Sequence, residues 1–169
     1  IQYTDAKIIA VTGSNGKTTT TLLIGHILKK AGLSVGVAGN IGESFALQVA
    51  NENYDYYVLE LSSFQLDGIR SFKPHIAILL NITPDHLDRY GNNIQNYVQS
   101  KLRITMNQNS SDYLIYCADD SNTTEHIKTQ AQCLPFSIKK KIEQGAYLEK
   151  DEIKLNINDK SFIMNIQQL

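Results

Sequence analysis

The sequence lacks an excess of either charge and has no long apolar run. Its 16 Lys and Arg residues nearly balance its 17 Asp and Glu residues, giving a formal net charge of −1, whereas nucleic-acid-binding proteins are typically basic. No apolar segment approaches the roughly 20 residues of a membrane-spanning helix, and the first five residues lack the charged and apolar regions of a signal peptide. We therefore expect a cytoplasmic protein whose partners include neither nucleic acid nor a membrane.

Cysteine is scarce, and an initial methionine is absent. The spacing of Cys117 and Cys133 fits neither a zinc site nor a redox pair, so we interpret both as ordinary small apolar residues. A length of 169 residues suits one domain of ordinary size. Because the chain begins with Ile1, we expect residues 1–169 to be a single domain excised from a longer protein, with flanking domains missing.

Short apolar runs alternate with helical patterns along the first two thirds of the chain. We expect strands at 7–12, 33–39, 56–62, 75–82 and 113–118, and helices after the Gly-rich turn at 13–16, at 43–51 and at 94–106. Such alternation predicts an α/β fold with a mainly parallel P-loop-type sheet flanked by helices. Shorter apolar runs at 146–149, 153–157 and 161–166, separated by polar turns, predict a small antiparallel β meander near the C-terminus.

The strongest chemical signal is a Gly-rich loop between the first strand and the first helix. It reads Gly13-Ser14-Asn15-Gly16-Lys17-Thr18-Thr19. In such loops the backbone N–H groups and the helix dipole hold a phosphate, the lysine reaches the β- and γ-phosphates, and the hydroxyl after it binds Mg²⁺. The loop is a shortened variant, because Val11 stands where the common form has its first glycine. An ordinary glycine turn with a solvated lysine is the alternative.

Polar residues also follow the second, third and fourth expected strands. They are Asn40, the segment 60–65 and the segment 81–88. In open α/β sheets ligands bind beyond the carboxyl ends of the strands, so we expect these residues to converge with the Gly-rich loop. Glu60 lies in an apolar run, where a carboxylate is costly unless it is paired or binds a metal. A solvent-facing acid at the end of a strand is the alternative.

Two further candidates depend on context. Asp85, His86 and Asp88 could bind a divalent ion or orient one another, although a lone loop histidine is more often structural. The remaining histidines, His26, His75 and His126, have no companion pattern and are interpreted as structural. Lys101 lies on an expected helix, and without further information it is a surface lysine.

Four motifs together resemble the Mur ligases of peptidoglycan synthesis. They are the Gly-rich loop, Gly39-Asn40-Ile41-Gly42, the segment 60–66 (Glu-Leu-Ser-Ser-Phe-Gln-Leu) and the segment 81–90 (Asn-Ile-Thr-Pro-Asp-His-Leu-Asp-Arg-Tyr). The resemblance covers roughly residues 7–120. The last two motifs look like the D-glutamate-adding branch, because the diamino-acid-adding ligases typically have a histidine where this chain has Phe64. Those ligases remain the alternative within the family.

The resemblance implies a reaction and a set of site residues. ATP phosphorylates the carboxylate of UDP-N-acetylmuramoyl-L-alanine, and D-glutamate attacks the acyl phosphate. By resemblance Lys17, His86 and Lys101 are catalytic, and Asn40 and Ser62 contact the substrate. The resemblance further implies two Mg²⁺ ions. Their implied ligands are Thr18, Glu60, His86 and a carbamylated Lys101.

The resemblance also implies that parts are missing and that the enzyme is a monomer. Domains for the uridine end of the substrate and for D-glutamate are expected on either side, and the chain stops before the family's His-Asn segment near the adenine. We therefore expect this chain alone to have little or no ligase activity. A phosphate-loop module that binds nucleotide without joining amides is the alternative from another class. It gives no reason for Asn40, the segment 62–65 and Lys101 to lie at one edge.

Overall fold

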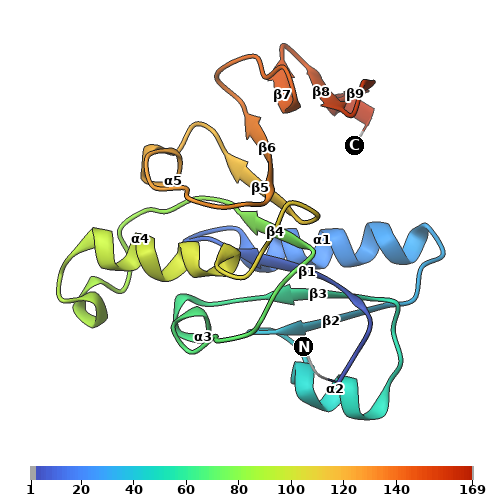
Figure 1. Cartoon of the computed structure of the whole chain (residues 1–169). Coiled ribbons are helices and arrows are strands. Elements are labelled where there is room, and N and C mark those ends of the chain that lie inside the picture. The colour runs from blue at the N-terminus through green and yellow to red at the C-terminus, as the bar shows by residue number, and fades with distance from the viewer. Residues whose placement is uncertain (1–2, 169) are drawn as a thin grey trace.

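The computed structural model describes residues 3–168, which form one nine-stranded sheet in the order β2-β3-β1-β4-β5-β6-β7-β8-β9 (Figure 1). The strands are β1 (Lys7–Thr12), β2 (Val35–Gly39), β3 (Tyr56–Glu60), β4 (Ile76–Leu79), β5 (Tyr113–Cys117), β6 (Gln132–Ser137), β7 (Gly145–Glu149), β8 (Glu152–Ile157) and β9 (Lys160–Asn165). The α-helices are α1 (Lys17–Lys30), α2 (Phe45–Asn51), α3 (Ser63–Asp67), α4 (Ile94–Leu102) and α5 (Ser121–Thr124), and short 3₁₀ turns are η1 (Leu87–Tyr90), η2 (Arg103–Thr105) and η3 (Ile166–Gln168).

The predicted fold class is confirmed. The strands from β2 to β7 in this order pair in parallel, and β7, β8 and β9 pair antiparallel as the expected meander. The meander is continuous with the main sheet, because β7 pairs with β6. Strand β6 has no counterpart in the sequence prediction. Its Pro135 lies inside the strand, and proline usually argues against a strand interior.

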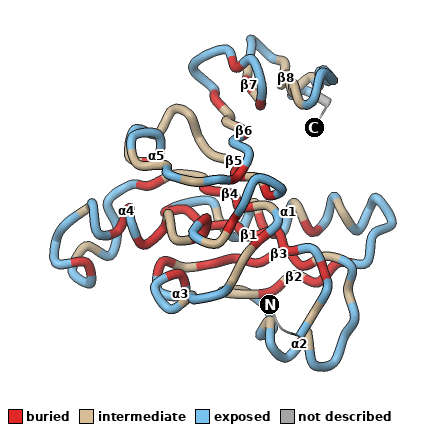
Figure 2. The backbone as a smooth tube through the Cα atoms, viewed as in Figure 1, coloured by how far each residue is buried: buried red, intermediate tan, exposed pale blue. Residues whose placement is uncertain are grey.

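Alternating side chains of β1 divide the core into two layers. Ile8 and Ala10 pack with residues of α3 and α4 on one face, whereas Ile9 and Val11 pack toward α1 on the other. This period of two is what a strand covered on both faces requires. Buried backbone accordingly gathers along β1, β3 and β4 in the middle of the molecule (Figure 2). The site is therefore built on a deeply buried part of the sheet.

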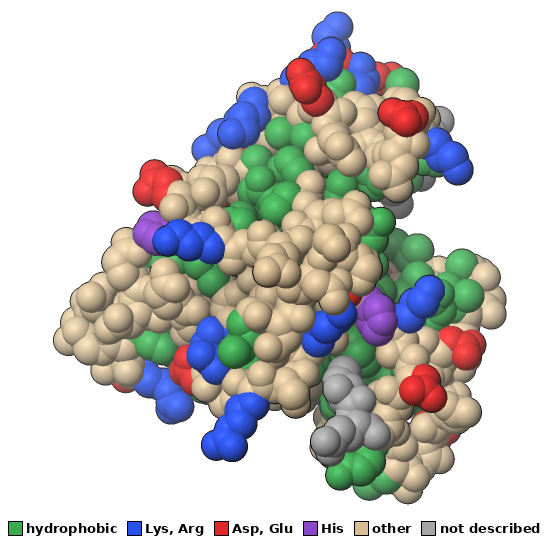
Figure 3. Space-filling view, in the orientation of Figure 1, with side chains coloured by type: hydrophobic (Ala, Val, Ile, Leu, Met, Phe, Trp, Pro, Cys, Tyr) green, Lys and Arg blue, Asp and Glu red, His purple; other side chains and the backbone are tan. Residues whose placement is uncertain are grey.

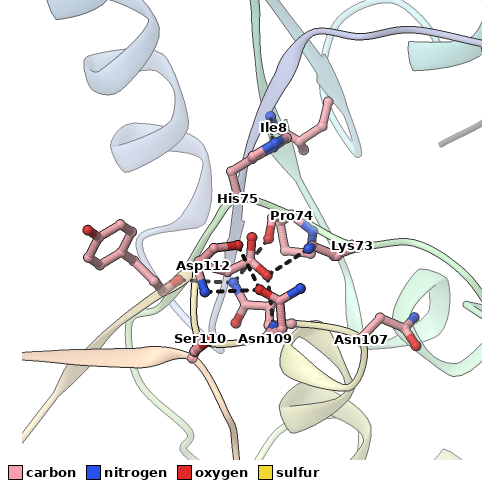
Figure 4. Close-up of polar contacts among 12 residues, drawn as sticks. Ile8, Lys73, Pro74, His75, Asn107, Asn109, Ser110 and Asp112 are labelled. Carbon is pink, nitrogen blue, oxygen red and sulfur yellow. Dashed lines mark hydrogen bonds and ion pairs between the residues drawn. The ribbon is translucent and has the colours of Figure 1, made fainter.

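The amino ends of β4 and β5 are held by a buried polar network (Figure 4). The Asp112 side chain is 2 % exposed, forms an ion pair with Lys73 at 3.1 Å and accepts a hydrogen bond from the Asn109 N–H at 2.8 Å. His75 Nδ1 accepts a bond from the Ile8 N–H at 3.1 Å, a contact that fits its structural interpretation. This network lies at the opposite ends of the strands from the polar clusters identified in the sequence, so it supports the sheet without joining the site.

Charged side chains of both signs lie on the surface of the protein (Figure 3). Lys and Arg side chains are scattered among acidic ones on the face shown in Figure 3. Within residues 3–168, none of the helices combines the length and apolarity needed to cross a bilayer.

Candidate active site at the carboxyl ends of β1, β3 and β4

The Gly-rich loop leads from β1 into α1. Gly16 adopts a left-handed conformation with φ of 82° immediately before the helix, and no side chain caps the N-terminus. Glycine takes this conformation without steric cost. The first intrahelical bond runs from the Thr20 N–H to the Gly16 carbonyl. The first turn of α1 therefore presents uncapped N–H groups and a positive dipole end, which is the arrangement that binds phosphate.

The Lys17 side chain folds back onto the backbone of the loop. Its ammonium donates to the carbonyls of Gly13 at 3.0 Å and Ser14 at 2.9 Å. The Ser14 hydroxyl in turn donates to the Thr83 carbonyl at 2.9 Å, and the Thr83 N–H donates back to it at 3.0 Å. The Tyr97 hydroxyl lies 3.3 Å from the Ser14 hydroxyl oxygen. The loop is thereby fixed to the segment after β4, and Lys17 lies within reach of a ligand at the helix N-terminus.

Glu60 occupies the centre of the site. It ends β3 and is only 2 % exposed. The Thr18 hydroxyl donates to Oε2 at 2.7 Å, and the Asn40 side-chain amide donates to Oε1 at 3.0 Å. The alternative of a solvent-facing acid is therefore wrong. Strand-end residues from β2 and β3 and the first turn of α1 meet at one carboxylate, as the strand-end argument predicts.

Gly39 makes this approach possible. Its φ is 109°, and a Cβ added there would lie 2.2 Å from the Glu60 carbonyl oxygen, a distance no real side chain allows. The backbones of β2 and β3 can therefore come together only with glycine at this position. The Asn40 N–H then donates to the same carbonyl at 2.9 Å, which aims the Asn40 side chain at the carboxylate.

Lys101 is buried beneath the loop. It is 1 % exposed, so the interpretation as a surface lysine is wrong. Its ammonium donates to the Gly13 carbonyl at 2.9 Å and lies 4.6 Å from the centre of the Tyr97 ring. Burial, together with the nearby charge of Lys17, lowers the pKa of Lys101 to about 7, and Asp85 opposes this shift. A substantial fraction of Lys101 is thus a neutral, nucleophilic amine at neutral pH.

Ser62 acts as the N-cap of α3. Its hydroxyl accepts a bond from the Gln65 N–H at 3.3 Å, and the Gln65 side chain accepts one from the Ser62 N–H at 2.9 Å. This is a capping box. The strand expected at 56–62 therefore ends at Glu60, because the Ser-x-x-Gln spacing begins a helix. The sequence contains this signal, although the short helix was not predicted.

His86 and Lys101, which were expected at a second metal, share no hydrogen bond or ion pair within residues 3–168. His86 is exposed, adopts a φ of 49°, and places Nε2 3.6 Å from an Asp85 carboxylate oxygen. Its ring packs against Phe64, which also lies under the Arg89 guanidinium at 4.2 Å. Among residues 3–168, no group of three His, Cys, Asp or Glu side chains is arranged to hold a metal. The second metal site stays a prediction.

Two contributors were given no individual role from the sequence, although Asn81 belongs to the segment 81–88 that was expected to converge with the loop. Asn81 and Asp120 both follow strands, and the Asp120 carboxylate accepts a bond from the Ile82 N–H at 2.7 Å. The strand-end rule that selected Asn40 also selected the segment of Asn81, and it applies equally to Asp120. The sequence offered no way to tell a side chain that holds the loop from one that faces a ligand.

The oxygen donors at the loop suit one Mg²⁺ ion. Thr18 Oγ1 and Glu60 Oε2 lie 2.7 Å apart beside the helix N-terminus. Mg²⁺ prefers oxygen ligands and is usually held by one or two carboxylates or hydroxyls together with phosphate oxygens and water. Glu60 and Thr18 therefore fit such an ion.

The lowered pKa of Lys101 predicts a pH-dependent stability. The folded chain releases the Lys101 proton near pH 7, whereas the unfolded chain holds it until about pH 10.4. The unfolded state therefore binds more protons between these values, and the unfolding free energy should rise with pH by at most about 1.4 kcal/mol per unit.

Urea unfolding of the chain and of Lys101→Met in carbon-dioxide-free buffers between pH 7 and 9.5 measures the contribution of Lys101 to the unfolding free energy. The wild-type chain should gain stability relative to Lys101→Met as pH rises. The control Lys30→Met changes an exposed residue of α1, and its unfolding free energy should depend on pH as that of the wild-type chain does. Parallel curves for the wild-type chain and Lys101→Met would contradict the prediction.

Comparison with known proteins identifies the family. The model of the Mur ligase middle domain matches residues 11–169. The UDP-N-acetylmuramoylalanine--D-glutamate ligase of Christiangramia forsetii is 55 % identical over 99 % of this chain and 38 % of its own length, and that of Bacteroides fragilis is 56 % identical over 90 % and 35 %. The chain thus spans little more than a third of these relatives.

Solved structures support the same fold. A UDP-N-acetylmuramoyl-L-alanyl-D-glutamate--2,6-diaminopimelate ligase has a TM-score of 0.70 at 23 % identity, covering 95 % of this chain and 39 % of its own. MurF from Thermotoga maritima, in complex with ADP, has a TM-score of 0.70 at 20 % identity, covering 96 % and 40 %. The nine-stranded sheet, the loop with its buried glutamate and these matches agree: the chain belongs to the Mur ligase family, as its middle domain.

Proposed function

We propose that the protein containing this chain is an ATP-dependent ligase that adds D-glutamate to UDP-N-acetylmuramoyl-L-alanine. The observation that carries the proposal is the buried Glu60, bridged between Thr18 of the loop and Asn40 of the next strand end. Glu60 thereby links Thr18 of the proposed phosphate-binding loop to Asn40, which we propose contacts the substrate. The names of relatives at 55 % and 56 % identity support D-glutamate as the acceptor. Because the chain spans about a third of them, the activity belongs to a longer protein, which we propose is cytoplasmic and monomeric, with domains flanking this one.

The reaction has two steps. A carboxylate oxygen of the alanyl substrate attacks the γ-phosphorus of ATP, the bond to the β-phosphate oxygen breaks, and ADP leaves. The amine nitrogen of D-glutamate then attacks the acyl carbon, phosphate leaves, and the nitrogen loses a proton. Phosphoryl transfer of this kind depends on positioning and charge neutralisation rather than on covalent bonds to the protein.

The loop residues 13–19 would hold the ATP phosphates. The uncapped N–H groups at the start of α1 and the Lys17 ammonium face the same region. Glu60 and Thr18 would hold a Mg²⁺ ion, which neutralises charge on the phosphates. In the structure Lys17 contacts two loop carbonyls. The ammonium has three N–H groups, so the third is available for a phosphate oxygen.

Asn40 and Ser62 would contact the muramoyl-alanine part of the substrate, and His86 and a carbamylated Lys101 would hold a second Mg²⁺. Asn40 is exposed and adjoins Glu60, which supports its role. Ser62 is half-buried, and its hydroxyl already serves the capping box, so it would have to share that oxygen. His86 is exposed on the loop after β4 and is not held by a hydrogen bond from its ring within the described residues, so it can turn toward an ion.

Carbamylation of Lys101 gives a direct prediction. The neutral amine would attack carbon dioxide, forming a C–N bond and releasing a proton, and the anion produced would relieve the repulsion from Lys17. In ¹³C-bicarbonate buffer the NMR spectrum of the chain should show a carbamate carbon signal that is absent from Lys101→Met. Lys30→Met should keep the signal, and equal spectra for the chain and Lys101→Met would contradict carbamylation of Lys101.

The metal role of Glu60 is the test of the proposed function. Glu60→Gln keeps the shape but removes the charge, so ATP affinity in the presence of Mg²⁺ should fall about tenfold or more, equivalent to about 1.4 kcal/mol. Affinity without Mg²⁺ should stay the same or rise, because a negative charge near the phosphates is lost. Titration calorimetry with and without Mg²⁺ measures both. The exposed Glu52→Gln is the control, and an unchanged Mg²⁺ dependence in Glu60→Gln would refute the proposal.

A further inference from the structure

Asn81 pairs with the phosphate loop through its side chain. Beyond the last ladder bond, from the Leu80 N–H to the Thr12 carbonyl, the Ser14 N–H donates to the Asn81 carbonyl at 2.9 Å. The Asn81 carboxamide then repeats the pattern with the next residue. Its Oδ1 accepts from the Asn15 N–H at 2.9 Å, and its Nδ2 donates to the Asn15 carbonyl at 3.1 Å. The side chain thus replaces a peptide group and extends the pairing by one residue into the loop.

This pairing divides the loop into two parts. The N–H groups of Ser14 and Asn15 are occupied by Asn81. In the described part of the chain, the N–H groups of Gly16, Lys17 and Thr18 have no hydrogen-bond acceptor. From Ser14 onward, the donors that a phosphate can use therefore begin at Gly16, and the peptides of Ser14 and Asn15 serve to fix their direction.

The backbone next to Asn81 is fixed by hydrogen bonds to residues of another segment. The next residue, Ile82, donates its N–H to the Asp120 carboxylate at 2.7 Å, and its carbonyl accepts from the Asn122 side chain at 2.8 Å. Both groups come from the segment after β5. A functional side chain keeps its geometry when the residues behind it are fixed in this way. The carboxamide is therefore presented to the loop by two neighbouring strand ends.

We propose that Asn81 is a positioning residue for the phosphates of ATP. By holding the Asn15 peptide it aims the N–H groups of Gly16, Lys17 and Thr18 at the ligand. Asparagine is required because the contact needs both a donor and an acceptor: leucine offers neither, and aspartate would add a negative charge beside the phosphates. The role rests on the proposed function, since it presupposes that the loop binds ATP.

The test compares Asn81→Leu with Asn107→Leu. Asn107 also makes two bonds from its side chain to backbone, donating to the Arg70 and Phe72 carbonyls at 2.8 Å each, but it lies on the segment after η2. Calorimetry measures the affinity of the wild-type chain and both variants for Mg²⁺ with ADP and for Mg²⁺ with inorganic tripolyphosphate. Thermal unfolding and the exchange rate of the Asn15 amide proton are measured on the same samples.

Asn81→Leu should weaken both ligands about tenfold and speed exchange at Asn15, with little change in unfolding midpoint because Asn15 is exposed. Asn107→Leu should lower the midpoint and leave both affinities within about twofold. Should Asn81→Leu not fold, Asn81→Ala is measured in its place, with the same expected losses.

Unchanged affinity in the Asn81 variant overturns the inference, and so does an equal loss in Asn107→Leu, since that would show general loosening. In both cases the wild-type chain still binds and the proposed function stands. A wild-type chain that binds neither ligand overturns the proposed function, and this role of Asn81 falls with it.

Discussion

The carboxylate of Glu60 is the group on which the site depends. A charge at the end of a buried strand is costly unless polar partners or a cation compensate it. Thr18 and Asn40 supply two hydrogen bonds, and a Mg²⁺ ion would supply the missing positive charge. The same contacts bring the first turn of α1 and the end of β2 to one point. The hydrogen bonds that compensate the buried Glu60 carboxylate thus also connect the phosphate loop to Asn40.

The order of the strands explains why this point lies at β1. Strand β1 has β3 on one side and β4 on the other. The chain leaves β1 toward β2 in one half of the sheet and leaves the neighbouring β4 toward β5 in the other half, and ligands bind at such a position. Glu60 comes from the first neighbour and Asn81 from the segment after the second. The loop between β1 and α1 is held from both sides, which leaves the first turn of α1 as its ligand-facing part.

Local patterns were enough to predict the strand, loop and helix around Lys17, and the strand-end rule was enough to bring Asn40 and Glu60 together. The rest depended on contacts that a linear sequence does not show. Lys101 was interpreted from the sequence as a surface lysine, yet it is buried under the Gly13 carbonyl, because only the folded chain places α4 beneath the loop. Strand β6 was not predicted, and its Pro135 is unfavourable within a strand. Pairing with β5 and β7 outweighs this local preference in the folded chain.

The most direct test of this account is a crystal structure of the chain with Mg²⁺ and a non-hydrolysable ATP analogue. The account predicts a Mg²⁺ ion bound by Thr18 Oγ1 and a Glu60 carboxylate oxygen, phosphate oxygens bound by the N–H groups of Gly16, Lys17 and Thr18, and the Lys17 ammonium bound to a phosphate oxygen. Phosphates bound away from the N-terminus of α1, or an ion that does not touch Glu60, would contradict it.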